Sequence, residues 1–135
     1  MISYYISGRS PDNVTYSIDK LILDFKLKVC SGEEFASDLL LFLSLDPHLV
    51  FKNWESRKIG TFRQQFDFTC SDGNSFWVGV GLNTAGRVGN RVRLEFNPNK
   101  VGKDISFVRV FNRIRVLSVG PPRFVRLDLA LDVPF

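Results

Sequence analysis

The sequence is poor in residues that bind transition metals or form disulfides, with one histidine, two cysteines and one methionine among 135 residues. The single histidine, His48, excludes a metal site built on paired histidines. Cys30 and Cys70 stand far apart and outside any Cys-x-x-Cys or Cys-His pattern, so neither a disulfide framework nor a cysteine metal site is indicated. We expect two buried free thiols, and any metal ion must be bound by carboxylates.

Long apolar runs are also missing, since no stretch approaches the roughly 20 consecutive apolar residues of a membrane span. Met1 to Ser10 lacks the basic-then-apolar pattern of a secretory signal, so we expect a cytoplasmic protein. The chain is 44% hydrophobic and 24% charged, which is typical of a globular domain, and no linker or repeat divides it. Residues 1–135 are therefore predicted to form a single domain, or a piece of a larger one, with residues 1–17 as an irregular leader.

Positive charge is concentrated late in the chain, although the formal net charge is only +4. Between Arg87 and Arg126 the only acids are Glu95 and Asp104. A segment of this composition attracts a polyanion. Its basic residues are Arg87, Arg91, Arg93, Lys100, Lys103, Arg109, Arg113, Arg115, Arg123 and Arg126.

Apolar periodicity predicts a mixture of strands and helices. Residues 19–29 alternate apolar and polar side chains, which predicts a half-buried strand. Ser31-Gly32-Glu33-Glu34 is a capping box that starts a helix, and Asp46-Pro47 ends it. Ser71-Asp72-Gly73-Asn74 is typical of a hairpin turn. Further strands are predicted at 51–54 leading into 61–70, at 75–81, at 90–97 and at 123–133, with a second helix at 104–118.

The resulting order, β-α-β-β-β-α-β, predicts an α+β fold with a mostly antiparallel sheet. Two helices embedded in such an order are expected to cover one face of the sheet, close to a ferredoxin-like arrangement. The 13 phenylalanines predict a core of aromatic and β-branched side chains, the kind that pack well on a pleated sheet.

Acidic side chains on two predicted strands form a candidate metal site. In the last strand, Asp128 and Asp132 share one face, about 13 Å apart at ordinary strand rise, so one of them is the better ligand. Glu95 stands among arginines on the strand at 90–97. If these two strands are neighbours, Glu95 and Asp128 come within cross-strand distance and can hold Mg²⁺ or Mn²⁺. The alternative is that these acids form salt bridges with the arginines around them.

Basic and aromatic residues of the same strands form a candidate nucleic-acid surface. Phe76 and Trp77 are possible stacking platforms for unpaired bases, although at least one of them is expected in the interior. Lys100 and Lys103 stand beside glycine before a helix, where a phosphate can bind. The candidate DNA-binding residues are Arg91, Arg93, Lys100, Lys103, Arg123 and Arg126.

Four segments together resemble the Rep_trans family of rolling-circle replication initiators from plasmids and phages. They are Ile18-Asp19-Lys20-Leu21-Ile22-Leu23-Asp24-Phe25, Phe76-Trp77-Val78-Gly79, Arg93-Leu94-Glu95-Phe96-Asn97-Pro98-Asn99-Lys100 and Arg126-Leu127-Asp128-Leu129-Ala130-Leu131-Asp132. The last segment is the most specific, because it resembles the family's strand that carries a metal-binding aspartate.

The resemblance implies an HUH-nuclease-like fold, metal binding by Asp128 with Glu95, and single-stranded or origin DNA as the partner, with a host helicase as a further partner. Members of that family are DNA-nicking endonucleases that attack DNA with a tyrosine downstream of the aspartate strand. This sequence ends at Phe135 and has no tyrosine after Tyr16, so no catalytic residue is assigned, and enzymatic activity is left open.

The short chain is either a fragment of a larger initiator or a complete protein that kept the fold without the chemistry, and the sequence leaves both open. Three functions follow from these alternatives. The first is the DNA-binding and metal-binding part of an initiator. The second is a non-catalytic DNA-binding or protein-interaction domain of a phage or plasmid regulator, and the third is a structural domain whose arginines only solubilise an aromatic core.

Overall fold

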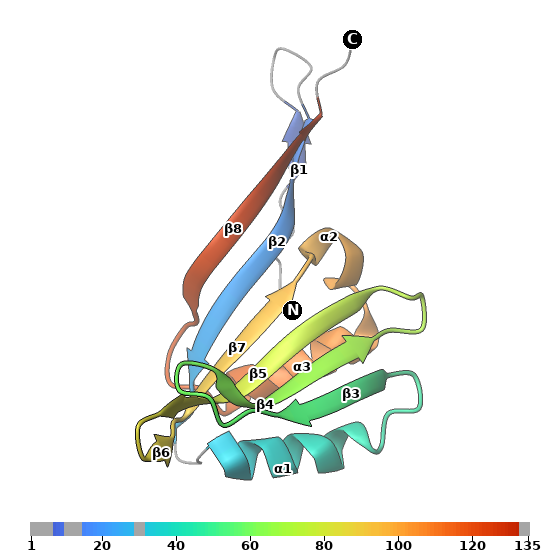
Figure 1. Cartoon of the computed structure of the whole chain (residues 1–135). Helices are drawn as coiled ribbons and strands as arrows, with labels where there is room; N and C mark the ends of the chain where they lie inside the picture. The colour runs from blue at the N-terminus through green and yellow to red at the C-terminus, as the bar shows by residue number, and fades with distance from the viewer. Residues whose placement is uncertain (1–6, 10–14, 29–31, 133–135) are drawn as a thin grey trace.

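The computed structural model shows a sheet of antiparallel strands accompanied by helices (Figure 1). It describes the backbone of residues 7–9, 15–28 and 32–132, and the side chains of residues 18–28 and 32–128. The strands are β1 (Ser7–Arg9), β2 (Thr15–Lys26), β3 (Val50–Glu55), β4 (Phe62–Thr69), β5 (Ser75–Thr84), β6 (Arg87–Val88), β7 (Arg91–Phe96) and β8 (Arg123–Asp132). The helices are α1 (Gly32–Leu43), α2 (Pro98–Val101) and α3 (Ile105–Val116).

The long strand β2 organises the sheet. It pairs with β8 along one edge, and with β7 and a short stretch of β1 along the other. From β7 the sheet continues through β5 and β4 to β3, and β5 also folds back onto β6. Each of these pairings is antiparallel, so the predicted α+β class with a mostly antiparallel sheet is confirmed.

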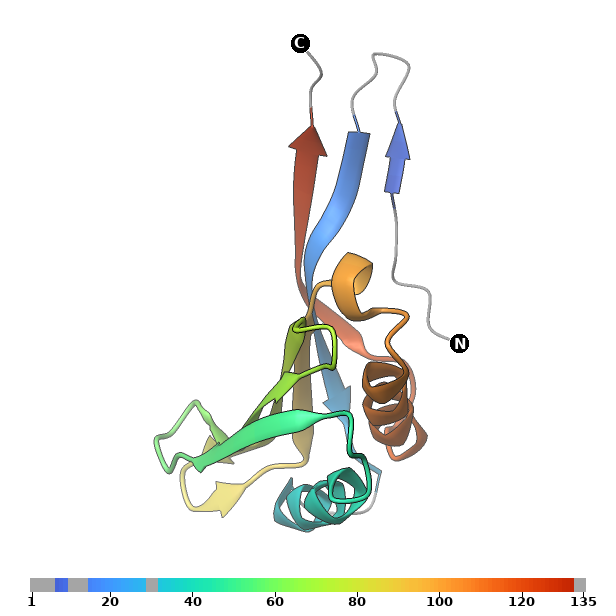
Figure 2. The same ribbon diagram turned by 90° about the vertical axis from the view of Figure 1, so that its right-hand side faces the viewer.

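The helices α1 and α3 lie on the same side of the sheet, as the view along the sheet shows (Figure 2). Their apolar side chains and the inner face of the sheet enclose one hydrophobic core, in which Phe107 of α3 packs against both Phe76 of β5 and Phe96 of β7. The predicted aromatic core is therefore confirmed, and Phe76 is the interior member of the Phe76-Trp77 pair.

Local chemistry explains where two elements begin. Asp104 caps α3, because its carboxylate accepts a hydrogen bond of 3.0 Å from the backbone N–H of Phe107. The start of α1 lies so close to β5 that a Cβ at Gly32 would be 2.7 Å from the carbonyl oxygen of Gly89 and would overlap Gly81. Glycine at position 32 therefore allows α1 to approach the sheet.

Some expectations need correction. The irregular leader predicted for residues 1–17 is wrong for residues 7–9 and 15–17, which belong to β1 and β2, because strand pairing overrides the missing alternation there. The short elements β6 and α2 were not predicted. Ser31 of the capping box and Cys30 lie outside the described residues.

None of the helices in the described ranges is long and apolar enough to span a membrane.

Candidate functional site

The face of the sheet opposite α1 and α3, here called the open face, carries most of the predicted site residues. Leu21, Leu23 and Phe25 of β2 point into the core, so Ile22 and Asp24, which alternate with them, point to the other side. Residues directly opposite one another in an antiparallel pair share a face. The pairings therefore place these side chains on the open face: Glu95, Arg93 and Arg91 from β7, and Asp128, Arg126 and Arg123 from β8.

Three arginines surround one buried carboxylate at the centre of this face. Arg93 donates two hydrogen bonds to Asp24, whose side chain is only 4% exposed. Arg91 and Arg123 approach the same carboxylate at 3.8 Å and 3.6 Å, and their side chains are 45% and 69% exposed. We call Arg91, Arg93 and Arg123 the arginine cluster. Three positive charges against one negative charge leave the cluster with an excess of two.

The pKa of Arg93 is raised above its ordinary value, chiefly because the guanidinium hydrogen-bonds to Asp24, with smaller contributions from the charges of Asp24 and Glu95. Desolvation opposes this shift. Arg93 is thus a permanent cation whose donors are partly used within the protein. Arg91 and Arg123 make only the longer contacts to Asp24, so most of their donors face solvent.

Aromatic rings extend the open face beside the arginine cluster. Phe62 of β4 and Trp77 of β5 pack edge to face with centroids 5.9 Å apart, and the guanidinium of Arg93 lies 5.3 Å from the centre of the Phe62 ring. Gly79 makes room for both rings, because a Cβ there would overlap them. Phe62 is buried, whereas Trp77 is partly exposed. Trp77 is therefore the aromatic platform of this face next to the arginines.

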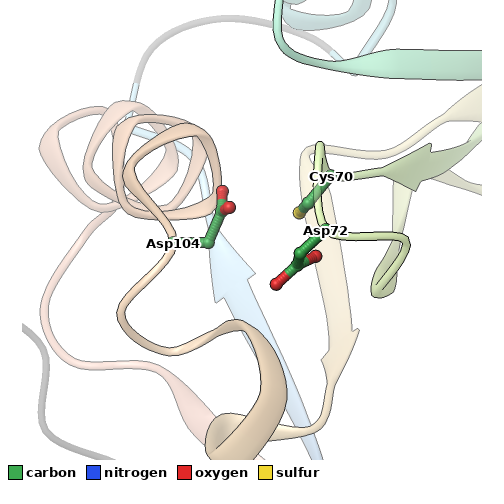
Figure 3. A group of neighbouring side chains, drawn as sticks. All are labelled: Cys70, Asp72 and Asp104. Carbon is green, nitrogen blue, oxygen red and sulfur yellow. The ribbon is translucent and has the colours of Figure 1, made fainter.

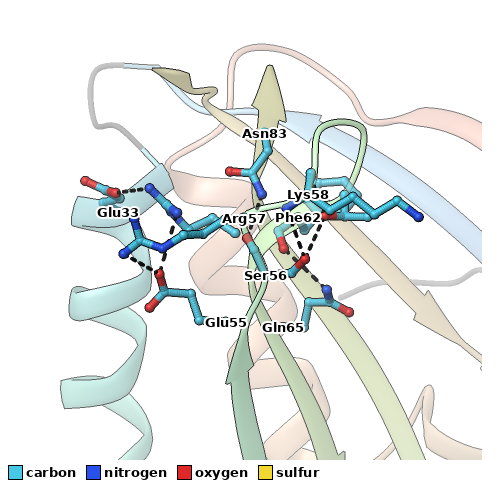
Figure 4. A network of polar contacts seen from close by, with 10 residues as sticks. Glu33, Glu55, Ser56, Arg57, Lys58, Phe62, Gln65 and Asn83 are labelled. Atoms are coloured by element: carbon cyan, nitrogen blue, oxygen red, sulfur yellow. Dashed lines mark hydrogen bonds and ion pairs between the residues drawn. The ribbon is translucent and has the colours of Figure 1, made fainter. Parts of the chain in front are cut away.

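A polar network fixes the loop before β4 and so the position of Phe62 (Figure 4). The side-chain amide of Asn83 donates to the carbonyl of Ser56 at 2.7 Å, and the hydroxyls of Ser56 and Thr61 lie 3.0 Å apart. Asn83 is buried, so its hydrogen bond to Ser56 satisfies a polar group that would otherwise be costly to bury. The network therefore fixes the loop that leads directly into Phe62, the first residue of β4.

The predicted metal ligands do not converge. β2 lies between β7 and β8, so Glu95 and Asp128 are not on neighbouring strands. Asp128 is directly opposite Lys20 and accepts a hydrogen bond of 2.9 Å from Arg126. The side chain of Asp132 lies outside the described residues. Glu95 and Asp128, as placed here, do not fit a shared divalent cation, because the ligands of one ion must approach it together.

Glu95 instead lines an open hollow of about 260 Å³ at one end of the open face. Asp19, Asp67 and Trp77 also line this hollow, and Lys20 contributes a positive charge to it. The hollow adjoins the aromatic platform, since Trp77 is directly opposite both Glu95 and Asp67 in the sheet. Its acids give this end of the face a charge opposite to that of the arginine cluster.

One other group of potential ligands exists among the described side chains: Cys70, Asp72 and Asp104 (Figure 3). Burial raises the pKa of the Cys70 thiol to about 12, and the charge of Asp104 and a hydrogen bond to its carboxylate act in the same direction. The protonated thiol therefore ties the β4–β5 turn to the start of α3. Each carboxylate also accepts backbone N–H groups nearby, so the group is accounted for by local structure.

The sequence pattern located some members of this surface and missed others. Arg91, Arg93 and Arg126 lie on the open face, as alternation along their strands predicted. Alternation would place Arg123 with Leu127, but the register shift between Ile22 and Leu23 brings Arg123 opposite Asp24 on the open face. Lys100 lies in α2 and Lys103 follows it, outside the sheet. Asp24 and Phe62 were missed. Asp24 stood on the predicted polar face of its strand among lysines, and only the pairing with β7 and β8 shows its arginine partners.

Comparisons of this chain with family models, curated proteins and solved structures find no match. The function of the surface must therefore be inferred from its own geometry.

Proposed function

We propose that the open face binds single-stranded nucleic acid, as the DNA-binding part of a rolling-circle replication initiator. The observation that carries the proposal is the arginine cluster around Asp24. Arg93 makes the two hydrogen bonds to this carboxylate, whereas Arg91 and Arg123 stand farther from it and remain exposed in a region of excess positive charge. Phosphate oxygens are the complementary ligand for such guanidinium groups.

The basic surface continues along the open face beyond the arginine cluster. Arg91 and Arg123 come from β7 and β8, the two strands that flank β2. Strands separated by one other strand are about 10 Å apart, but the guanidiniums of Arg91 and Arg123 converge on the same Asp24 oxygen, so together they form one binding point for a phosphate. Arg126 lies further along β8 on the same face and extends the basic track.

The aromatic platform favours unpaired bases over a duplex. Trp77 is partly exposed next to the cluster and is held by Phe62. Bases can stack on such a ring only when they are free of a duplex, and stacking contributes about 1–3 kcal/mol per base. In the described part of the chain both long helices lie on the opposite face (Figure 2), which leaves room here for a nucleic-acid strand to lie across the sheet.

A more specific proposal comes from the resemblance to replication initiators. An antiparallel sheet with both long helices on one face is compatible with a ferredoxin-like, HUH-nuclease-like topology, in which the other face is free to hold origin DNA. No tyrosine side chain and no converged pair of predicted metal ligands lies in the part of the chain whose side chains the structure describes. The proposed role of this chain is therefore to bind DNA, without a cleavage step.

The test is a fluorescence-anisotropy titration of the full chain with a fluorescein-labelled oligothymidylate at low salt, with a hairpin duplex of equal charge as competitor. The proposal predicts saturable binding that weakens as the salt concentration rises. It also predicts that unlabelled oligothymidylate displaces the labelled strand at a lower concentration than the duplex does. Absence of binding at low salt, or stronger binding to the duplex, contradicts it.

A further inference from the structure

β8 is an edge strand of the sheet. Within the described residues it pairs with β2 only, and both ribbon views show its other side facing away from the rest of the sheet (Figures 1 and 2). The backbone N–H and C=O groups along that side have no strand to pair with in the described part of the chain. Such a row of groups is a template for a further strand.

The side chains of β8 make this edge unusually apolar. Leu127 and Val125 are 45% and 40% exposed, although Leu127 is directly opposite the fully buried Leu21. α1 and α3 cover the inner sheet but leave these residues accessible. Exposed apolar side chains on a strand edge that natural proteins usually protect indicate a surface for pairing.

The charges on β8 favour a second copy of β8 as the strand that pairs with this edge. Arg126 and Asp128 stand on either side of Leu127 and point to the open face. When two copies of β8 pair antiparallel about Leu127, each Arg126 is opposite Asp128 of the other copy, and the two Leu127 side chains meet on the inner face. The strand is therefore complementary to itself.

The neighbouring registers are unfavourable. A two-fold axis centred on Asp128 would place two carboxylates opposite each other. An axis centred on Arg126 would place two guanidiniums opposite each other. Like charges directly opposite in a sheet destabilise the pair. A two-fold interface centred on Leu127 is thus selected by charge as well as by apolar contact.

We propose that β8 is the interface for a second copy of this chain, which joins two sheets edge to edge in antiparallel register about Leu127. This inference does not depend on nucleic-acid binding. Its consequence for the molecule is a sheet that continues across the two-fold axis, with an arginine cluster on the same face in each half. The contact is centred on one strand, so the dimer is expected to dissociate on dilution.

The experiment is sedimentation velocity on the full chain across the micromolar range, without nucleic acid. Arg126→Asp makes both charged positions of the edge acidic, and Asp128→Arg makes both basic. Each variant alone is expected to dimerise about tenfold or more weakly than the wild type. An equimolar mixture of the two is expected to form a heterodimer, and the double exchange Arg126→Asp/Asp128→Arg is expected to restore the homodimer.

Two controls show whether a change in dimerisation arises at this edge. Both residues are solvent-accessible, so thermal melting should show that each variant folds. Lys52→Glu on β3, at the opposite edge, is expected to leave the dimer unchanged. A wild type that stays monomeric throughout, single variants that dimerise as the wild type does, or a mixture that remains monomeric would each overturn the proposal.

Discussion

Arg93 and Asp24 are 69 residues apart in the sequence, yet they are directly opposite each other on β7 and β2. Arg93 Nε donates to Asp24 Oδ1 at 2.7 Å and Arg93 Nη2 donates to Asp24 Oδ2 at 3.0 Å. This two-point contact fixes both planar groups. It joins the fold to the proposed site, because the carboxylate that pairs with Arg93 also lies within 4 Å of the guanidiniums of Arg91 and Arg123.

The first prediction concerns the stability that this contact provides. Asp24→Asn removes the charge that three arginines share, and we expect it to lower the free energy of unfolding by about 2 kcal/mol, because Asp24 is buried but Arg93 is partly solvated. Asp38→Asn is the matched control. Asp38 also receives a two-point contact from Arg113, but both side chains are more than a third exposed, so the loss should stay below about 1 kcal/mol. Urea denaturation measures both, and equal losses would contradict a special role for the buried pair.

The second prediction concerns the Cys70 thiol. Its pKa is raised to about 12 from the ordinary 9.0, mainly by burial, so the folded protein keeps the proton where the unfolded chain loses it. The stabilisation is complete below pH 9 and declines as the pH rises from there through 12. In a Cys30→Ser background, we expect negligible reaction of Cys70 with a thiol reagent at pH 8 under native conditions. Cys70→Ala should flatten the alkaline fall in stability, and rapid native labelling would disprove this description.

The third prediction concerns Gly79, which lies beneath the aromatic pair. A Cβ at this position would be 2.7 Å from Cγ of Phe62 and would also overlap the Trp77 ring. We therefore expect Gly79→Ala to displace the rings and lower the free energy of unfolding by about 1–3 kcal/mol. Thermal denaturation and the tryptophan emission spectrum report the change. An alanine variant with unchanged stability and emission would show that the rings do not need this space.

The fourth prediction tests Trp77 as the stacking platform. The chain has two tryptophans, so Trp54→Phe leaves Trp77 as the single reporter, and Trp77→Phe leaves Trp54. Oligothymidylate is expected to quench the emission of Trp77 strongly and that of Trp54 weakly, because β3 lies at the far edge of the sheet from the arginine cluster. Stronger quenching of Trp54 would place the bound strand elsewhere.

Much of the fold was predictable because it follows from local patterns. Alternation located most of β2 and β8, helical spacing located α1 and α3, and Asp72-Gly73 located the turn between β4 and β5. β1 was not predicted because pairing with β2, rather than its own sequence, holds it as a strand. The boundaries of β2 shifted toward Thr15 for the same reason.

The candidate site was only partly predictable, because it depends on strand order. Alternation correctly placed Arg91 and Arg93 on one face of β7. It could not show that β2 separates Glu95 from Asp128, since the order of strands is set by packing of the whole sheet. Because β2 lies between β7 and β8, Asp24 is also placed between arginines of two different strands. No spacing in the sequence indicates this arrangement.

Nucleic-acid binding by the open face is best tested through the salt dependence of oligothymidylate binding by two charge-matched variants. Arg91→Ala/Arg123→Ala removes two exposed arginines from the open face, and Arg109→Ala/Arg115→Ala removes two exposed arginines from α3. We predict that the first variant binds more weakly and that its slope of log affinity against log salt falls by about 0.7 for each lost phosphate contact, whereas the second retains the wild-type slope. Equal effects of the two variants, or a larger effect from α3, would contradict binding at the open face.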